Sequence, residues 1–137
     1  MKTLVGSFAA LVLVVTTTFG QETKKAQSST VNGPRIEIQP ESHDFGNVQQ
    51  NLKLIKEFAL TNTGDEDLII SRISTSCGCT AALTAEKVVK PGKSTSLKVT
   101  FETRRYKGAI QRSVSIASND PRRIRTVKVK AFVEESN

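Results

Sequence analysis

Residues 95–102 read TSLKVTFE, and this stretch decides the fold. Its apolar side chains, Leu97, Val99 and Phe101, alternate with polar ones. Successive side chains of an extended chain point to opposite faces, so the alternation is typical of a strand with one buried and one solvated face. The turn-forming residues 90–93, KPGK, come shortly before it. We therefore predict a half-buried β-strand that follows a tight turn.

Similar stretches lie on both sides of this strand, separated by groups of turn-forming residues, and no stretch has a helical pattern. The 43–48 stretch is expected at a sheet edge because Gly46 interrupts it. The 68–73 stretch is more continuously apolar and is expected in the centre of a sheet. The predicted strands cover residues 35–38, 43–48, 52–61, 68–73, 88–89, 95–101, 108–116 and 126–133.

These strands indicate a single all-β domain. Seven or eight strands within about 100 residues, with a turn signal roughly every 8–12 residues, are typical of an antiparallel β-sandwich. Antibody domains have a Cys…Trp…Cys core, whereas this chain of 137 residues has no Trp and only one residue between its two cysteines. The predicted fold is therefore an immunoglobulin-like antiparallel β-sandwich of seven or eight strands that is not an antibody relative.

The composition argues against catalysis. The chain has one His (His43), one Tyr (Tyr106) and no Trp. A multi-histidine metal centre is excluded, and general-base chemistry has only one imidazole available. The sequence also has no phosphate-binding glycine loop, no Ser-His-Asp arrangement and no paired-carboxylate site. We therefore predict that the protein is not an enzyme.

Residues 1–20 read MKTLVGSFAALVLVVTTTFG and have the layout of a secretory signal peptide: a basic start, an apolar stretch and a weakly polar end. The predicted cleavage lies between Gly20 and Gln21. An uncleaved membrane anchor is the alternative, because residues 3–20 carry no charge. Residues 21–34 form a predicted flexible leader, 35–133 the sandwich domain and 134–137 a tail. Export would place the protein in the periplasm or at the cell surface.

The chain is basic, with a net charge of +7 from 20 basic and 13 acidic residues. A basic surface attracts polyanions, but the predicted export argues against nucleic acid as a partner. Arg104-Arg105 and the arginine-rich segment 122–125 are candidate anion-binding groups, with a solvated basic face as the alternative interpretation. Membrane contact is expected only through an uncleaved signal or through this basic face.

The only concentrated chemistry is Cys77-Gly78-Cys79, which follows the predicted strand 68–73. On an extended chain the two side chains point to the same face, and Gly78 permits a bend that brings the sulfurs within reach of a disulfide. Two thiolates also suit a Cu(I) ion, with His43 as a third ligand, whereas a tetrahedral zinc site lacks its fourth ligand. The third interpretation is two free thiols that pack at a strand end. All three interpretations stay open at this point.

Five short motifs occur in order along the domain: HDFGNV at 43–48, FALTNTG at 58–64, SCGCT at 76–80, PGK at 91–93 and SNDP at 118–121. With these motifs the chain resembles the bacterial domain-of-unknown-function family 1573. That family is similar to the immunoglobulin-like domains called ASH or hydin-like, and more distantly to major sperm protein and pilus chaperones. The resemblance covers about residues 35–133. It implies an immunoglobulin-like fold and an exported, non-enzymatic protein.

Together these observations predict an exported, non-catalytic immunoglobulin-like module that binds a protein partner or is a structural component of the cell envelope. A sheet face or an exposed sheet edge would hold the partner. The alternative is a small thiol-dependent protein that uses Cys77 and Cys79 to bind Cu(I) or to exchange electrons. The leading prediction involves no cofactor, and it leaves the identity of the partner and the oligomeric state open.

Overall fold

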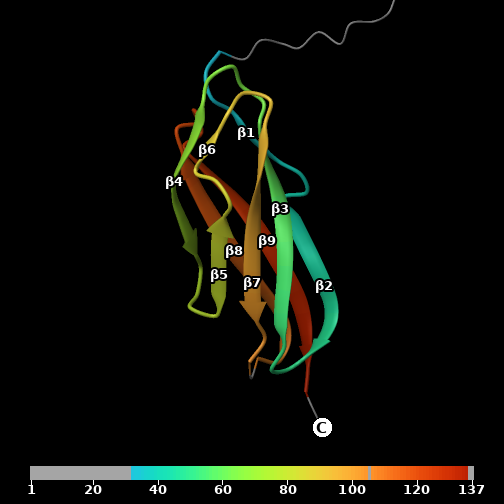
Figure 1. The fold of residues 1–137 in the computed structure, drawn as a ribbon. Helices are drawn as coiled ribbons and strands as arrows, with labels where there is room; N and C mark the ends of the chain where they lie inside the picture. Colours follow the sequence, from blue (N-terminus) through green and yellow to red (C-terminus); the bar gives the residue numbers. More distant parts are fainter. Residues whose placement is uncertain (1–31, 105, 136–137) are drawn as a thin grey trace, which may run out of the picture.

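The computed structural model of the chain describes residues 32–104 and 106–135 (Figure 1). The predicted signal peptide, its cleavage between Gly20 and Gln21 and most of the predicted leader lie outside these residues. In the described part, no helix is long and apolar enough to cross a membrane. The strands are β1 (Ile36–Ile38), β2 (Ser42–Gln49), β3 (Lys53–Asn62), β4 (Leu68–Thr75), β5 (Thr80–Thr84), β6 (Val88–Val89), β7 (Ser94–Glu102), β8 (Gly108–Ser118) and β9 (Ile124–Glu134).

The strands form two sheets that pack face to face (Figure 1). One sheet has the order β1-β3-β7-β5 and the other the order β2-β9-β8-β4-β6. Neighbours pair antiparallel except β2 and β9, which run parallel. The prediction of an all-β sandwich is confirmed, with nine strands in the described residues rather than seven or eight. The additional strand is β5, whose short sequence TAALT lacks a clear alternation of apolar and polar side chains.

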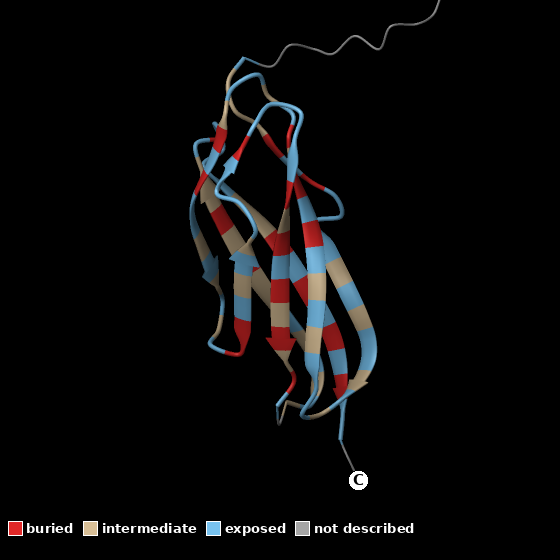
Figure 2. Ribbon diagram, viewed as in Figure 1, coloured by how far each residue is buried: buried red, intermediate tan, exposed pale blue. Residues whose placement is uncertain are grey.

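The core lies between the two sheets and follows the alternation seen in the sequence (Figure 2). Leu97, Val99 and Phe101 of β7 are at most 1% exposed. Val127 and Val129 of β9 are buried to the same degree in the opposite sheet. Full burial of a side chain of this size stabilises the folded state by about 1.5–3 kcal/mol. These positions therefore fix which face of each strand turns inward.

The predicted edge position of residues 43–48 is confirmed. These residues belong to β2, the outermost strand of its sheet. Its pairing with β9 shifts register between Asp44 and Asn47, where Gly46 has a φ of 69°. Such a bulge bends a strand and interrupts its regular pairing, which resumes here at Asn47.

The predicted central position of residues 68–73 is confirmed only in part. In its sheet β4 lies between β8 and β6, but the short strand β6 pairs with it only at Leu68 and Ile69. Ile69 is 48% exposed, so the apolar stretch is not buried on both faces. From Ser71 to Thr75, no strand of the described chain pairs with the side of β4 that faces away from β8. This part of β4 is a sheet edge.

Candidate functional site

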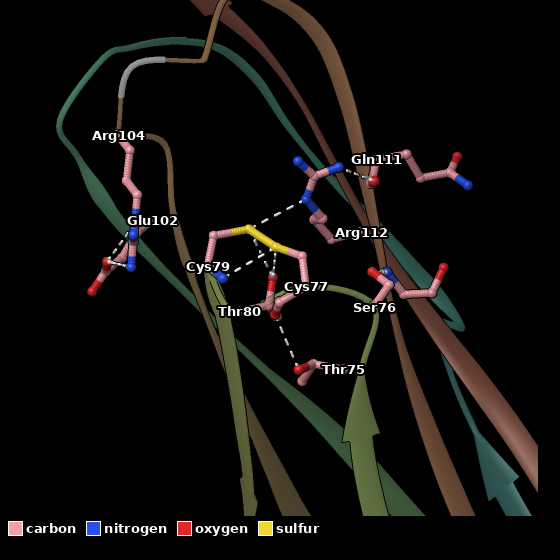
Figure 3. The surroundings of a disulfide bond; sticks show 10 residues. Thr75, Ser76, Cys77, Cys79, Thr80, Glu102, Arg104, Gln111 and Arg112 are labelled. Atoms are coloured by element: carbon pink, nitrogen blue, oxygen red, sulfur yellow. Dashed lines mark hydrogen bonds and ion pairs between the residues drawn. A yellow bond between two sulfur atoms is a disulfide. The ribbon is translucent and has the colours of Figure 1, made fainter.

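The Cys77-Gly78-Cys79 segment carries the chain from β4 in one sheet to β5 in the other (Figure 1). A disulfide joins the two cysteines, whose Cα atoms lie 5.4 Å apart (Figure 3). Cys77 is half-buried, whereas Cys79 is only 6% exposed. The structure thus brings the two predicted residues together. A redox role and copper binding stay predictions.

Arg112 is a residue of this site that the sequence analysis missed. Its Nε atom donates a hydrogen bond to the Sγ atom of Cys79 over 3.3 Å (Figure 3). The guanidinium group also lies over the Tyr106 ring, 5.0 Å from the ring centroid. Ile110, Val114 and Ile116 were expected on the inner face of their strand, and Arg112 falls on the same face. A cation at an inward position was the signal that could have revealed it.

Hydrogen bonds hold the connection between β4 and β5 independently of the disulfide. The N–H of Ser76 donates to the carbonyl of Ser113 over 2.9 Å, and the N–H of Ser113 donates back to the Ser76 hydroxyl over 3.0 Å. The carbonyl of Cys77 accepts from the N–H of Thr80 over 3.2 Å and from the hydroxyl of Thr75 over 3.2 Å. The loop therefore has its own set of contacts to β8 and within itself.

The disulfide adds little to folding stability. Only one residue separates the two cysteines, so the cross-link removes few conformations from the unfolded chain. The chain-entropy relation gives about 1.5 kcal/mol for a loop of this size, against about 3 kcal/mol for a loop of 15 residues. The stability of the fold therefore depends little on this cross-link.

His43 lies on β2, in register with Val129 of β9. Its ring packs against Phe45 with centroids 4.7 Å apart and an angle of 88° between the ring planes. Within residues 32–104 and 106–135, no group of three or more His, Cys, Asp or Glu side chains is placed to hold a metal ion. The structure therefore does not assemble His43 with the two cysteines as a metal-ligand cluster.

The two arginine clusters differ in their surroundings. Arg104 is exposed and pairs with Glu102 over 3.2 Å, and Arg105 lies outside the described residues. Arg122 and Arg125 instead tie β1 to the turn between β8 and β9, because both donate to the carbonyl of Ile36, over 2.7 and 3.1 Å. The interpretation of segment 122–125 as a merely solvated face is wrong for these two side chains.

Asp120, at the same turn, anchors this arrangement. Its carboxylate is 1% exposed and accepts from the N–H of Ile36 over 2.8 Å and from Arg122 over 3.0 Å. Burial by itself would raise the pKa of Asp120, but the hydrogen bonds from the Arg122 side chain and from the N–H groups of Ile36 and Arg122 lower it from 3.8 to about 2. The sequence analysis treated Asp120 only as a turn residue, because its partner Ile36 is 84 positions away.

A second feature lies beside the disulfide: the edges of β4 and β5 face each other across the gap between the sheets. A groove of about 230 Å³ runs between them and is lined by the apolar residues Ile70, Ile73, Ala82 and Leu83 and by the polar residues Ser71, Arg72, Thr84 and Lys87. Leu83 is 74% exposed. No other large apolar side chain of the described residues has so high an exposed fraction.

The backbone of β5 is open on the side of the groove. Ala85 donates to the carbonyl of Ser96 over 3.0 Å, and Glu102 donates to the carbonyl of Cys79 over 3.0 Å. In an antiparallel ladder, alternate residues bond to the same neighbour, so the odd-numbered residues of β5 bond to β7. The N–H and C=O groups of Ala82 and Thr84 therefore point to the other side, where β5 has no paired strand in the described chain. We call this side the β5 edge.

Three solved structures have similar folds. A protein of unknown function from Porphyromonas gingivalis W83 has 22% identity and a TM-score of 0.64, over 76% of this chain and 49% of that one. The ASH/PapD-like domain 7 of human CEP192 has 13% identity and a TM-score of 0.61, over 98% and 100%. The YadV chaperone has 12% identity and a TM-score of 0.51, over 72% and 52%. At these identities the likeness shows the fold, which is the immunoglobulin-like fold of ASH/PapD-like domains.

The chain spans about half the length of the Porphyromonas gingivalis protein that it matches. No match is found among curated proteins. The family model described as "Protein of unknown function (DUF1573)" matches residues 36–133, which is more than half of the chain. The chain therefore belongs to the DUF1573 family.

Proposed function

We propose that this protein is a non-catalytic binding module that holds an extended segment of a partner protein along the β5 edge. The observation that carries the proposal is the open backbone of Ala82 and Thr84, next to an apolar groove. A partner strand bonds to such an edge through its own main chain, and pockets for alternate side chains select its sequence.

The β5 edge differs from the other sheet edges in having no protection against strand pairing. Natural proteins block exposed edges with charges, bulges, prolines or very short strands. β2 has a bulge near Gly46, and β1 and β6 have only three and two residues. β3 carries Lys53, Lys56 and Glu57 where β1 leaves its side uncovered, and the open part of β4 carries Arg72. β5 reads TAALT, without charge, proline or glycine. The edge that lacks protection is the one best suited to accept a strand.

The groove gives the added strand a place for one apolar side chain. Ile70 and Ile73 of β4 form one wall, and Ala82 of β5 forms the other. The small Ala82 side chain leaves the groove open, and the exposed Leu83 lies at its rim. Each CH₂ group that a partner buries there contributes about 0.8 kcal/mol. We expect the partner segment to carry Leu, Ile or Val at the position that enters the groove.

We further propose that the module acts outside the cytoplasm. The support is the signal-peptide pattern of residues 1–20. Mass spectrometry of the protein from its own cell envelope tests this, because cleavage would leave a mature chain that begins at Gln21. A full-length chain in the membrane fraction would instead indicate an uncleaved anchor, and a full-length soluble chain would overturn export.

Site-specific crosslinking tests the β5 edge directly. A photo-crosslinking amino acid replaces Leu83 in one variant and Phe132 in a matched control. Phe132 is also an exposed apolar residue, at 48%, but it lies on the outer face of β9 in the other sheet. We expect a crosslinked partner at Leu83 only, joined through a segment with alternating apolar residues.

A proline substitution shows whether the partner bonds to the backbone. Ala82→Pro removes an N–H group that points away from β7, so the pairing of β5 with β7 keeps its hydrogen bonds. We expect Ala82→Pro to abolish the crosslink at position 83 while the variant stays folded by circular dichroism. Crosslinking at Phe132 as strong as at Leu83, or a crosslink that survives Ala82→Pro, would contradict strand addition at β5.

A further inference from the structure

The disulfide between Cys77 and Cys79 points to a second function of this protein. We propose that Cys77 and Cys79 form a thiol–disulfide exchange site, in which Cys77 is the attacked sulfur and Cys79 the leaving thiolate that Arg112 stabilises. The substrate is a dithiol on another protein. The proposal goes beyond the binding function of β5 and does not rest on it, because it uses other residues.

The bond is suited to be opened and closed. Its loss leaves the hydrogen bonds of Ser76 to Ser113 and of Thr80 to Cys77 in place, so the connection keeps its shape when the sulfurs separate. The cross-link also constrains only a three-residue loop. A disulfide that neither fixes the loop nor supports the fold can be reduced and re-formed while the protein stays folded.

The two sulfur atoms have different surroundings. Cys77 is half-buried and its Sγ atom accepts a hydrogen bond from the N–H of Cys79 over 3.1 Å, whereas Cys79 is only 6% exposed. The Nε–H of Arg112 points at Cys79 Sγ over 3.3 Å. Exchange occurs at the sulfur that a thiolate can reach, and it is faster when the other sulfur leaves as a stabilised thiolate. The geometry therefore assigns attack to Cys77 and departure to Cys79.

The surroundings of Arg112 are suited to the stabilisation of a negative charge on a neighbouring group. It falls on the inner face of β8, where the neighbouring inward residues are Ile110 and Val114. No carboxylate in the described part of the chain lies within ion-pair distance of its guanidinium group. Its partners are the Tyr106 ring, the carbonyl of Gln111 and the sulfur of Cys79. A Cys79 thiolate would supply the missing anion.

The exchange proceeds in two steps. A thiolate of the partner attacks Cys77 Sγ and forms a mixed disulfide, while the Cys77–Cys79 bond breaks and its electron pair goes to Cys79 Sγ beside Arg112. The second thiolate of the partner then attacks the partner's own sulfur in the mixed disulfide, and Cys77 leaves and takes up a proton from water. Two electrons pass from the partner dithiol to the cysteine pair. The partner's two protons go to water, which returns one to Cys77.

The first test measures which sulfur is attacked. The oxidised full-length protein is mixed with glutathione as the probe thiol, and free thiols are alkylated rapidly with iodoacetamide. Tandem mass spectrometry then cleaves the peptide that contains both cysteines at a bond between residues 77 and 79. The fragments show which cysteine carries glutathione and which carries the alkyl group. We expect glutathione on Cys77 and the alkyl group on Cys79. Glutathione on Cys79, or on both cysteines equally, would overturn the assignment.

The second test measures the role of Arg112. Arg112→Gln is compared with Arg123→Gln, a change at an exposed arginine in the turn between β8 and β9. We expect Arg112→Gln to slow reduction by dithiothreitol about tenfold and Arg123→Gln to leave the rate unchanged. Arg112→Lys retains the positive charge and should restore part of the rate. An Arg112→Gln rate equal to the wild-type rate, with both variants folded by circular dichroism, would overturn the proposal.

A pH profile separates charge stabilisation from a purely structural effect. In a Cys77→Ser background, the alkylation rate of Cys79 reports the fraction of thiolate at each pH. A tenfold stabilisation of the thiolate corresponds to a shift of about one pH unit. We expect Arg112→Gln to move the midpoint upward by about that amount. An unchanged midpoint would contradict the role of Arg112, whereas the crosslink at the β5 edge would be unaffected by this outcome.

Discussion

The β1 end of the sandwich and the connection between β4 and β5 treat polar groups in opposite ways. At the β1 end, the buried Asp120 accepts from the N–H of Ile36, and the buried Asn62 donates to carbonyl groups over 2.7 and 2.8 Å. The exception at the β1 end is the buried Nε atom of Arg35, which has no hydrogen-bond partner in the described chain. Near the connection, the backbone of Ala82 in β5 points to an open side, and Arg112 of β8 has no carboxylate partner among the described residues. Polar groups that are paired within the chain serve the fold, whereas an open backbone and an unpaired charge are available to a second molecule.

The sharpest test of this comparison is Asp120→Ala, for which we expect the largest loss of stability. The change leaves the N–H of Ile36 without its acceptor and removes the ion pair with Arg122. An unsatisfied buried donor, together with the loss of an ion pair whose Arg122 side chain is 47% exposed, costs about 3 kcal/mol. Urea unfolding measures the free energy of unfolding. Glu66→Ala, at an exposed carboxylate, is the control and should stay within about 0.5 kcal/mol of wild type.

The pH dependence of stability gives the next largest effect. The pKa of Asp120 in the folded state is about 2, below its ordinary value of 3.8, so folding favours the ionised form. This contribution is fully present above about pH 4 and is lost as the pH falls toward 2, by about 2 kcal/mol. In Asp120→Asn this contribution is absent at every pH. Urea unfolding of both proteins between pH 5 and pH 2 should show the gap in stability closing, and a constant gap would contradict the assignment.

The sequence indicated the fold well where its information is local. Leu97, Val99 and Phe101 are buried as their alternation predicts, because the side-chain period of a strand depends on the strand alone. Ile69 was misjudged because its side chain lies on the outer face of β4, between the inward Leu68 and Ile70, although its backbone is paired with Val88 of β6. Burial that depends on what covers a face of the sheet cannot be recognised from the pattern along one strand.

The sequence indicated the candidate site only in part. The Cys77-Gly78-Cys79 motif is contiguous and was therefore found. Arg112 and Asp120 act on residues 33 and 84 positions away, through pairings that only the folded sheets establish. The β5 edge was missed because TAALT has small side chains and no strong period. The functions proposed for this end depend on what the topology leaves uncovered, which no local pattern reports.

The disulfide should matter less for stability than Asp120, although a cross-link is often assumed to dominate. We expect the double change Cys77→Ser, Cys79→Ser to lower the free energy of unfolding by about 1.5 kcal/mol or less, because the closed loop is so short. Reduced and oxidised wild-type protein should differ by a similar amount in urea unfolding. A loss above 3 kcal/mol would show that the bond is structural and would weaken the exchange proposal.

The smallest expected effect on stability belongs to the residue that should matter most for binding. Leu83 is 74% exposed, so Leu83→Lys removes little buried surface, and we expect a change within about 0.5 kcal/mol in urea unfolding. A lysine at an edge strand also opposes strand pairing, so a crosslink from position 87, where Lys87 lines the groove and lies between β5 and β6 in the sequence, should disappear in this variant. Substitution of Asp120 would then lower mainly the stability of the fold, and substitution of Leu83 would weaken mainly the binding of the partner. If Leu83→Lys instead unfolds the protein, Leu83 belongs to the core, and the β5 edge is a structural boundary rather than a docking surface.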